Sequence, residues 1–232
     1  MWHVFAPALP FVCASHVILF DFDGTIVDTT ELIHESIRRT VTEVLGREPG
    51  RETLMANVGQ PLPRQMELLA DGQPEKTEEL LEVYLQHNEE LHEGLIREFP
   101  NVGTSLTRLR GAGLRLAVVT SKCRFSVEMA LDSFPDLRDV FDVFVTMEDT
   151  TEHKPLPAPL LKGLELLGDV SPERAAYAGD APFDVAAAHA AGVMSVAVSW
   201  GAFTAEALRA AGPDHLFEDL DSAVDFLLES AG

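Results

Sequence analysis

The sequence contains little cysteine, little lysine and no long apolar run. Its two cysteines, Cys13 and Cys123, match neither a metal-binding nor a disulfide pattern, which favours a reducing, cytoplasmic compartment. No apolar stretch approaches the length that a membrane span requires, so we expect no membrane partner. Residues 1–15 are apolar but contain no Lys or Arg. They therefore lack the charged start of a secretory signal and are interpreted as an irregular extension.

Positive charge is scarce, because 17 Lys and Arg residues stand against 38 Asp and Glu residues and give a formal net charge of −21. Nucleic acids are bound through Lys and Arg, so a chain this acidic is not expected to bind nucleic acid. Only four lysines are present, yet two of them, Lys122 and Lys154, follow predicted strands. We expect this pair to form a local positive pocket for a small anionic substrate.

The arrangement of apolar residues predicts an α/β fold. Short apolar runs typical of buried parallel strands alternate with helical segments, which indicates a doubly wound, Rossmann-like parallel sheet. Strands are predicted at 17–20, 116–120, 143–146, 175–178 and 195–198. Helices are predicted between them at 104–112, 125–133, 159–167 and 185–191.

The first two predicted strands are separated by far more chain than one crossover helix needs. This insert has helical periodicity throughout: Thr30 is placed to cap a first helix, Pro63 begins a second, and 78–96 is long enough for a third. We therefore predict a small α-helical cap domain placed over the carboxyl end of the first strand. The predicted boundaries are 29–99 for the cap and 1–28 with 100–232 for the catalytic core.

Acidic residues follow two of the predicted strands. Asp21 and Asp23 come directly after the first strand, and Asp180 and Asp184 follow the strand at 175–178. Open α/β sheets bind ligands at the carboxyl ends of their strands, so these carboxylates are expected to meet. Their mutual repulsion would be offset by a divalent cation, and oxygen ligands alone favour Mg²⁺. Asp180 would hold the ion, whereas Asp184 would bind it either directly or through water.

The same edge of the sheet offers the groups that phosphoryl transfer needs. Asp21 is suited to attack phosphorus and form an aspartyl-phosphate, and Asp23 to protonate the leaving oxygen and then activate water. Thr120, at the end of the second strand, would hydrogen-bond the transferring group. Lys154 would neutralise that group together with Asp21.

These elements resemble, in kind and in order, the four motifs of the haloacid dehalogenase superfamily of phosphatases. The motifs are Asp21-Phe22-Asp23-Gly24-Thr25, then Thr120, then Lys154, and then Gly179-Asp180-Ala181-Pro182-Phe183-Asp184. The resemblance implies Mg²⁺ held by the Asp21 carboxylate, the Asp23 backbone carbonyl and Asp180. It also implies that the helical insert is a cap of the family's first type.

Within the superfamily, the run 118–122, Lys154-Pro155 and the run 199–201 resemble phosphoglycolate phosphatases and related pyrophosphatases. The implied activity is hydrolysis of a small phosphorylated metabolite, either a 2-phosphoglycolate-like monoester or pyrophosphate. Ala181-Pro182 differs from the small polar residues that are more frequent there, which leaves the substrate open.

Five residues are expected to contact the substrate, namely Thr25, Ser121, Lys122, Gln60 and Arg64. Gln60 and Arg64 belong to a stretch that looks like the substrate-facing loop of the cap, and the guanidinium of Arg64 would hold an anionic leaving group. An ordinary exposed arginine at a helix N-terminus is equally compatible with the sequence.

Three other functions differ from hydrolysis in what they require of these residues. A sugar-phosphate mutase would share Asp21 and Asp23 and differ mainly in its cap. A catalytically silent binding protein would have no physical reason to keep several carboxylates together. A dehalogenase is not expected, because that chemistry needs no acid at Asp23. Both a monomer and a homodimer are compatible with the sequence.

Overall fold

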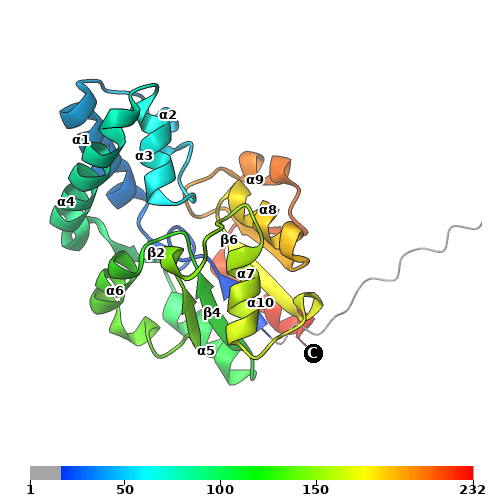
Figure 1. Ribbon diagram of the computed structural model, residues 1–232. Coiled ribbons are helices and arrows are strands. Elements are labelled where there is room, and N and C mark those ends of the chain that lie inside the picture. Colours follow the sequence, from blue (N-terminus) through cyan, green and yellow to red (C-terminus); the bar gives the residue numbers. More distant parts are fainter. Residues whose placement is uncertain (1–16, 232) are drawn as a thin grey trace, which may run out of the picture.

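The computed structural model describes residues 17–231 and consists of a sheet-based core with a group of helices beside it (Figure 1). The extension predicted at 1–15 lies outside the described residues. Six parallel strands form the main sheet in the order β5-β4-β1-β6-β7-β8. They are β1 (Val17–Phe20), β4 (Arg115–Val119), β5 (Val143–Val145), β6 (Ala175–Gly179), β7 (Met194–Val198) and β8 (His215–Phe217).

Strand β1 is buried on both faces because helices cover both sides of the sheet. Ile18 and Phe20 face one apolar cluster, and Val17 and Leu19 face another, as the alternation of side chains along a strand requires. The first cluster contains residues of α5 (Val102–Gly111), α6 (Arg124–Ser133) and α10 (Leu220–Ser230). The second contains residues of α7 (Ala158–Leu166) and α8 (Pro182–Ala191). The predicted doubly wound fold is confirmed.

Four of the five α-helices between β1 and β4 form a separate unit, shown in blue to green at the upper left of Figure 1. They are α1 (Thr30–Leu45), α2 (Arg51–Met55), α3 (Leu62–Ala70) and α4 (Thr77–Leu95). The unit has an apolar cluster of its own, which includes Ile37, Val41, Leu54, Met66 and Leu80. We propose that this helical unit is the cap, with the boundaries predicted from the sequence.

The two connections between the helical unit and the core are paired with each other. Strands β2 (Val27–Asp28) and β3 (Arg97–Glu98) run antiparallel, with Asp28 opposite Arg97. The prediction that Thr30 caps the first helix is wrong, because the Thr30 amide instead donates to Oδ1 of Asp28 at 3.1 Å. Thr29 occupies the N-cap position, but its hydroxyl donates to Asp23. The side chain of this N-cap residue therefore bonds to a residue of the site and does not cap the helix.

The remaining elements are short. They comprise α9 (Ala205–Ala211) and the 3₁₀ turns η1 (Pro74–Lys76), η2 (Pro135–Leu137), η3 (Met147–Asp149) and η4 (Pro172–Arg174). Sequence reasoning missed β8, which has only three residues, together with α9 and α10. Within residues 17–231, no helix is both long enough and apolar enough to cross a membrane.

Candidate active site

The site lies at the carboxyl end of β1, the strand between β4 and β6. Asp21 is the residue after β1, and its amide donates to the Ala178 carbonyl at 2.8 Å, which holds the backbone in the sheet. Thr120 and Asp180 occupy the corresponding positions after β4 and β6. Because these three strands are neighbours in a parallel sheet, their ends place the three side chains together.

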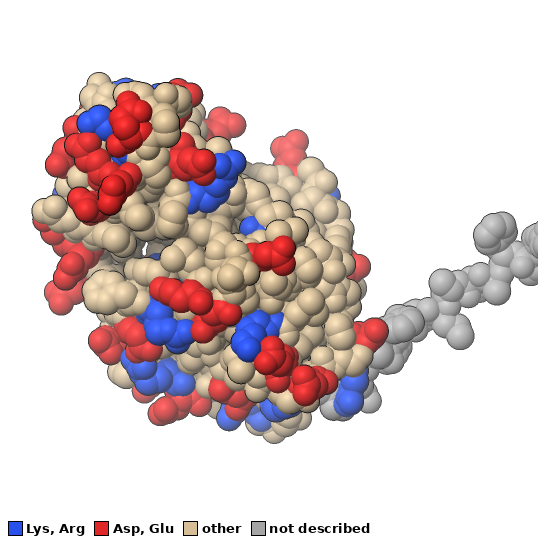
Figure 2. Space-filling model, in the orientation of Figure 1, with Lys and Arg blue, Asp and Glu red and all other residues tan. Residues whose placement is uncertain are grey.

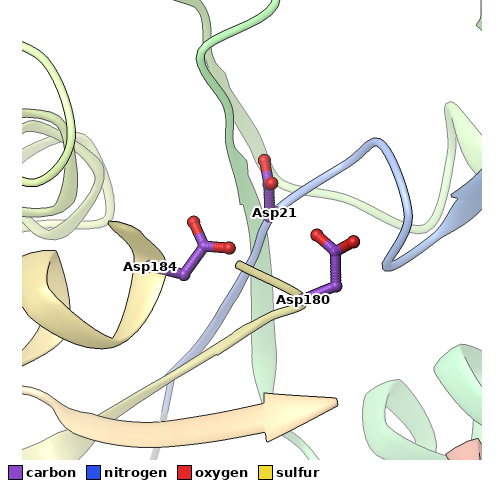
Figure 3. A group of neighbouring side chains, drawn as sticks. All are labelled: Asp21, Asp180 and Asp184. Carbon is purple, nitrogen blue, oxygen red and sulfur yellow. The ribbon is translucent and has the colours of Figure 1, made fainter. Parts of the chain in front are cut away.

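Asp21, Asp180 and Asp184 form a buried acidic cluster, and each can offer an oxygen within 4.8 Å of the others. Figure 3 shows their carboxylates turned toward one common region. Burial raises the pKa of Asp21 to about 7, although the charge of Lys154 opposes the shift. Burial and then the charge of Asp184 raise the pKa of Asp180 well above its ordinary value. Like charges this close are unfavourable without further positive charge.

The cluster fits a divalent cation. Three carboxylates face only one buried lysine within residues 17–231, so the negative charge of the cluster exceeds the positive charge beside it. Buried charge without full compensation is costly, so an added cation would relieve a real deficit. Oxygen-only donors are the ligands of hard cations. Asp23 is not part of the cluster, since its side chain lies elsewhere in the site.

Lys154 supplies the positive charge beside the cluster. Its side chain is fully buried, and its Nζ lies 2.7 Å from Oδ1 of Asp184 and 3.1 Å from Oδ1 of Asp21. Burial alone would lower the pKa of Lys154, but the charges of Asp184 and Asp21 outweigh burial and raise it. Lys154 is therefore charged, and it links the nucleophile candidate to the acidic residue on α8.

Sequence reasoning missed Tyr177, which holds Lys154 in place. The Tyr177 hydroxyl accepts a hydrogen bond from Lys154 Nζ at 3.0 Å and lies 2.9 Å from the Val119 carbonyl, to which it can donate. The sequence did contain a signal for Tyr177, because it is one large polar residue in a strand, Ala175–Gly179, that is otherwise made of Ala and Gly. Such a residue in a buried parallel strand needs a partner for its hydroxyl.

Gly24, Gly201 and the Ala202 amide form a cradle around Asp180, and larger residues do not fit at the two glycine positions. Its Oδ2 accepts a hydrogen bond from the Ala202 amide at 2.6 Å. A side chain at Gly24 or Gly201 would collide with the Asp180 carboxylate, and Gly24 also has a φ of +74°, which favours glycine. Glycine at position 24 thus allows the turn after Asp23 to lie against Asp180. No pattern in the sequence indicated this contact of Ala202.

Asp23 has its own set of partners. Its Oδ1 accepts the Thr29 hydroxyl at 2.9 Å, and Nζ of Lys122 lies 2.9 Å from both carboxylate oxygens. The Asp23 side chain is 19% exposed and that of Lys122 is 10% exposed, so the pair borders the solvent-accessible part of the site. The structure therefore places the predicted acid and a predicted substrate ligand in direct contact.

A cavity of about 60 Å³ lies between the acidic cluster and the helical unit, and the face drawn in Figure 2 is hollowed between that unit and the core. Predicted site residues that line the cavity are Asp21, Asp23, Gln60, Thr120, Ser121, Lys122 and Asp180. Three predicted substrate ligands thus border one space. Ser121 has a buried hydroxyl with no hydrogen-bond partner in the described part of the chain. That hydroxyl is free for a ligand.

Other predicted residues lie outside this cavity. Thr25 is 1% exposed, and its backbone carbonyl accepts the Trp200 indole N–H at 3.2 Å. Arg64 is half exposed and pairs with Glu67 at 2.5 Å, and it lines a different cavity, together with Gln60 and Lys154. In this arrangement Arg64 does not reach the cavity, and its role as a substrate ligand stays a prediction.

Comparisons with known proteins agree with this architecture. Residues 18–198 match the model of the family described as haloacid dehalogenase-like hydrolase. "Putative pyrophosphatase PpaX" of Caldanaerobacter subterraneus subsp. tengcongensis is 42% identical over 203 residues, which are 88% of this chain and 90% of that protein. "Pyrophosphatase PpaX" of Bacillus mycoides is 34% identical over 212 residues, 91% of this chain and 96% of that one.

A solved structure also superposes well. It is described as "a predicted phosphoglycolate phosphatase" from Haemophilus somnus 129pt and has a TM-score of 0.79 with 24% identity. The match covers 92% of this chain and 98% of that chain. At this identity the likeness shows the fold alone.

Proposed function

Because the chain belongs to the haloacid dehalogenase-like hydrolases and is a phosphatase of that family, we propose that it hydrolyses a small phosphorylated metabolite with Mg²⁺ through an aspartyl-phosphate. The observation that carries the proposal is the buried cluster at the end of β1. There Lys154 lies 3.1 Å from Asp21 and 2.7 Å from Asp184, and Asp180 completes the set. The proposed substrate is pyrophosphate or a 2-phosphoglycolate-like monoester.

The proposed chemistry has two steps. In the first step an Asp21 oxygen bonds to phosphorus, the bond from phosphorus to the leaving oxygen breaks, and the carboxyl proton of Asp23 goes to that oxygen. In the second step Asp23 takes a proton from water, whose oxygen displaces Asp21 and releases phosphate. Thr120 and Ser121 line the cavity, where they would donate to the oxygens of the transferring group.

We propose that Asp21 and Asp180 hold Mg²⁺, with Asp184 binding it directly or through water. The fit rests on the buried oxygen donors and on the excess of three carboxylates over the one lysine beside them. When bound, the ion would add positive charge against the oxygens of the transferred phosphoryl group. Lys154 stays beside Asp21 throughout, because Tyr177 and Asp184 hold its Nζ.

The names of the relatives favour pyrophosphate within this substrate class. The strongly acidic composition argues against nucleic acid as a partner. A cytoplasmic location and a monomeric or homodimeric state complete the proposal.

The test is phosphate release measured with Mg²⁺ and with EDTA on pyrophosphate, 2-phosphoglycolate and a sugar phosphate. Release should require Mg²⁺ and should fall by several orders of magnitude in Asp21→Asn, which keeps the shape of the side chain but removes the nucleophile. Asp139→Asn, an exposed acid in the core, is the matched control and should behave as wild type. Near-normal turnover by Asp21→Asn would exclude the aspartyl-phosphate route. Isomerisation without phosphate release would identify a mutase, and no turnover would favour a silent binding protein.

A further inference from the structure

The cavity has a single positive charge on its wall. Lys122 is the only Lys or Arg among the residues that line it. The helical unit contributes uncharged polar side chains there, namely Gln60, Gln65, Tyr84 and Asn88. Arg64, which the sequence analysis considered as a ligand of an anionic leaving group, is paired with Glu67 and does not line this cavity. An anionic group that enters the cavity on the cap side therefore meets Lys122.

Lys122 is held at the edge of this space by the proposed acid. Its Nζ contacts both oxygens of Asp23 at 2.9 Å, and no other partner of Nζ is found among residues 17–231. A lysine side chain is flexible and its ammonium carries three donors, so two contacts to one carboxylate orient it and leave a third donor. Because the Lys122 side chain is only 10% exposed, a pair formed there is weakly screened by solvent.

We infer that Lys122 determines specificity by binding an anionic oxygen of the leaving group, so that the enzyme prefers phosphate compounds whose leaving group carries its own negative charge. This inference rests on the proposed function. Asp23 keeps Lys122 oriented in the cavity and at the same time faces the oxygen that departs. The residue that binds the leaving group, Lys122, and the residue that protonates it, Asp23, are therefore neighbours.

The experiment compares two substrates, pyrophosphate and phenyl phosphate, in wild type and in Lys122→Met. Pyrophosphate has an anionic phosphate as leaving group, whereas phenyl phosphate releases a phenol without a second charge. Lys122→Met should lower kcat/KM for pyrophosphate by about 100-fold, chiefly through KM, and for phenyl phosphate by less than about 5-fold. Lys122→Arg keeps the charge and should retain most of the preference. Lys162→Met, a partly exposed lysine paired with Glu165, is the matched control.

The two substrates also separate this role from a purely structural one. A phenol has a pKa of about 10 and a phosphate group one of about 6, so phenyl phosphate depends at least as strongly on a well-placed acid. If Lys122 only positioned Asp23, phenyl phosphate would therefore lose as much activity as pyrophosphate. Equal losses, or an unchanged KM for pyrophosphate, would overturn the inference. If Lys122→Met does not fold, Lys122→Arg provides the test. Loss of the preference for pyrophosphate over phenyl phosphate in Lys122→Arg would also overturn the inference. A wild type that hydrolyses neither substrate with Mg²⁺ would instead refute the proposed function.

Discussion

Replacing Lys154 by Met tests how strongly the acidic cluster depends on its one buried cation. Methionine has a similar length and keeps the core filled, but it removes contacts of 2.7 Å to Asp184 and 3.1 Å to Asp21. Breaking a fully buried ion pair by removing one partner costs about 3–5 kcal/mol, since a charge is left without compensation. We therefore expect the free energy of unfolding in EDTA to fall by about 3 kcal/mol or more at pH 7.5.

The loss should shrink as the pH falls. The folded-state pKa of Asp21 is raised to about 7 from 3.8, so the native state binds more protons than the unfolded state between these values. The free energy of unfolding therefore decreases, as far as Asp21 is concerned, while the pH rises through this window. Without Lys154 the Asp21 pKa rises further, which extends the window upward. At pH 5.5 a protonated Asp21 would need no cation.

Urea denaturation at pH 5.5 and pH 7.5, with EDTA and then with Mg²⁺, measures both effects. Mg²⁺ should restore part of the stability of Lys154→Met, because a bound cation replaces some of the lost charge. Lys162→Met serves as control, and a surface lysine of this kind should shift stability by less than about 0.5 kcal/mol. A loss below about 1 kcal/mol at pH 7.5, or an equal loss at both pH values, would refute the electrostatic account.

Three further substitutions test other contacts of the site. Asp23→Asn should reduce hydrolysis of an alkyl phosphate more than that of p-nitrophenyl phosphate, whose leaving group needs less protonation; equal losses would assign Asp23 to positioning alone. Gly24→Ala should weaken Mg²⁺ binding measured by calorimetry, because the new methyl group collides with Asp180, and unchanged affinity would contradict the cradle. Thr29→Val removes the 2.9 Å hydrogen bond to Asp23 and should lower kcat by about 10-fold, with KM little changed, whereas a pure KM effect would argue against the contact.

Much of the architecture followed from local sequence patterns. Each of the five predicted strands is present within about two residues of its expected bounds, because buried parallel strands carry unbroken apolar runs that end where polar residues begin. The family was also predicted correctly, because residues 18–198 match its model. The prediction depended on the order in which Asp21, Thr120, Lys154 and Asp180 follow β1, β4, β5 and β6. Parallel strands present their carboxyl ends at one edge of a sheet, and this rule alone predicts that the residues after these strands lie close together.

Tertiary packing decided which of these side chains touch. Lys122 and Asp23 are 99 positions apart, and no local pattern indicates that this lysine turns to the acid. The pair of Arg64 and Glu67, three positions apart on α3, is by contrast one that helix spacing allows. The support from Tyr177 likewise depends on a hydrogen bond to a carbonyl of another strand, Val119.

Residues close in sequence determine the helical periodicity and the ends of the strands. These features could therefore be predicted from the sequence itself. The direction of a long flexible side chain is set by the charges and cavities that the folded chain brings near it, so the partner of Lys122 became visible only in three dimensions.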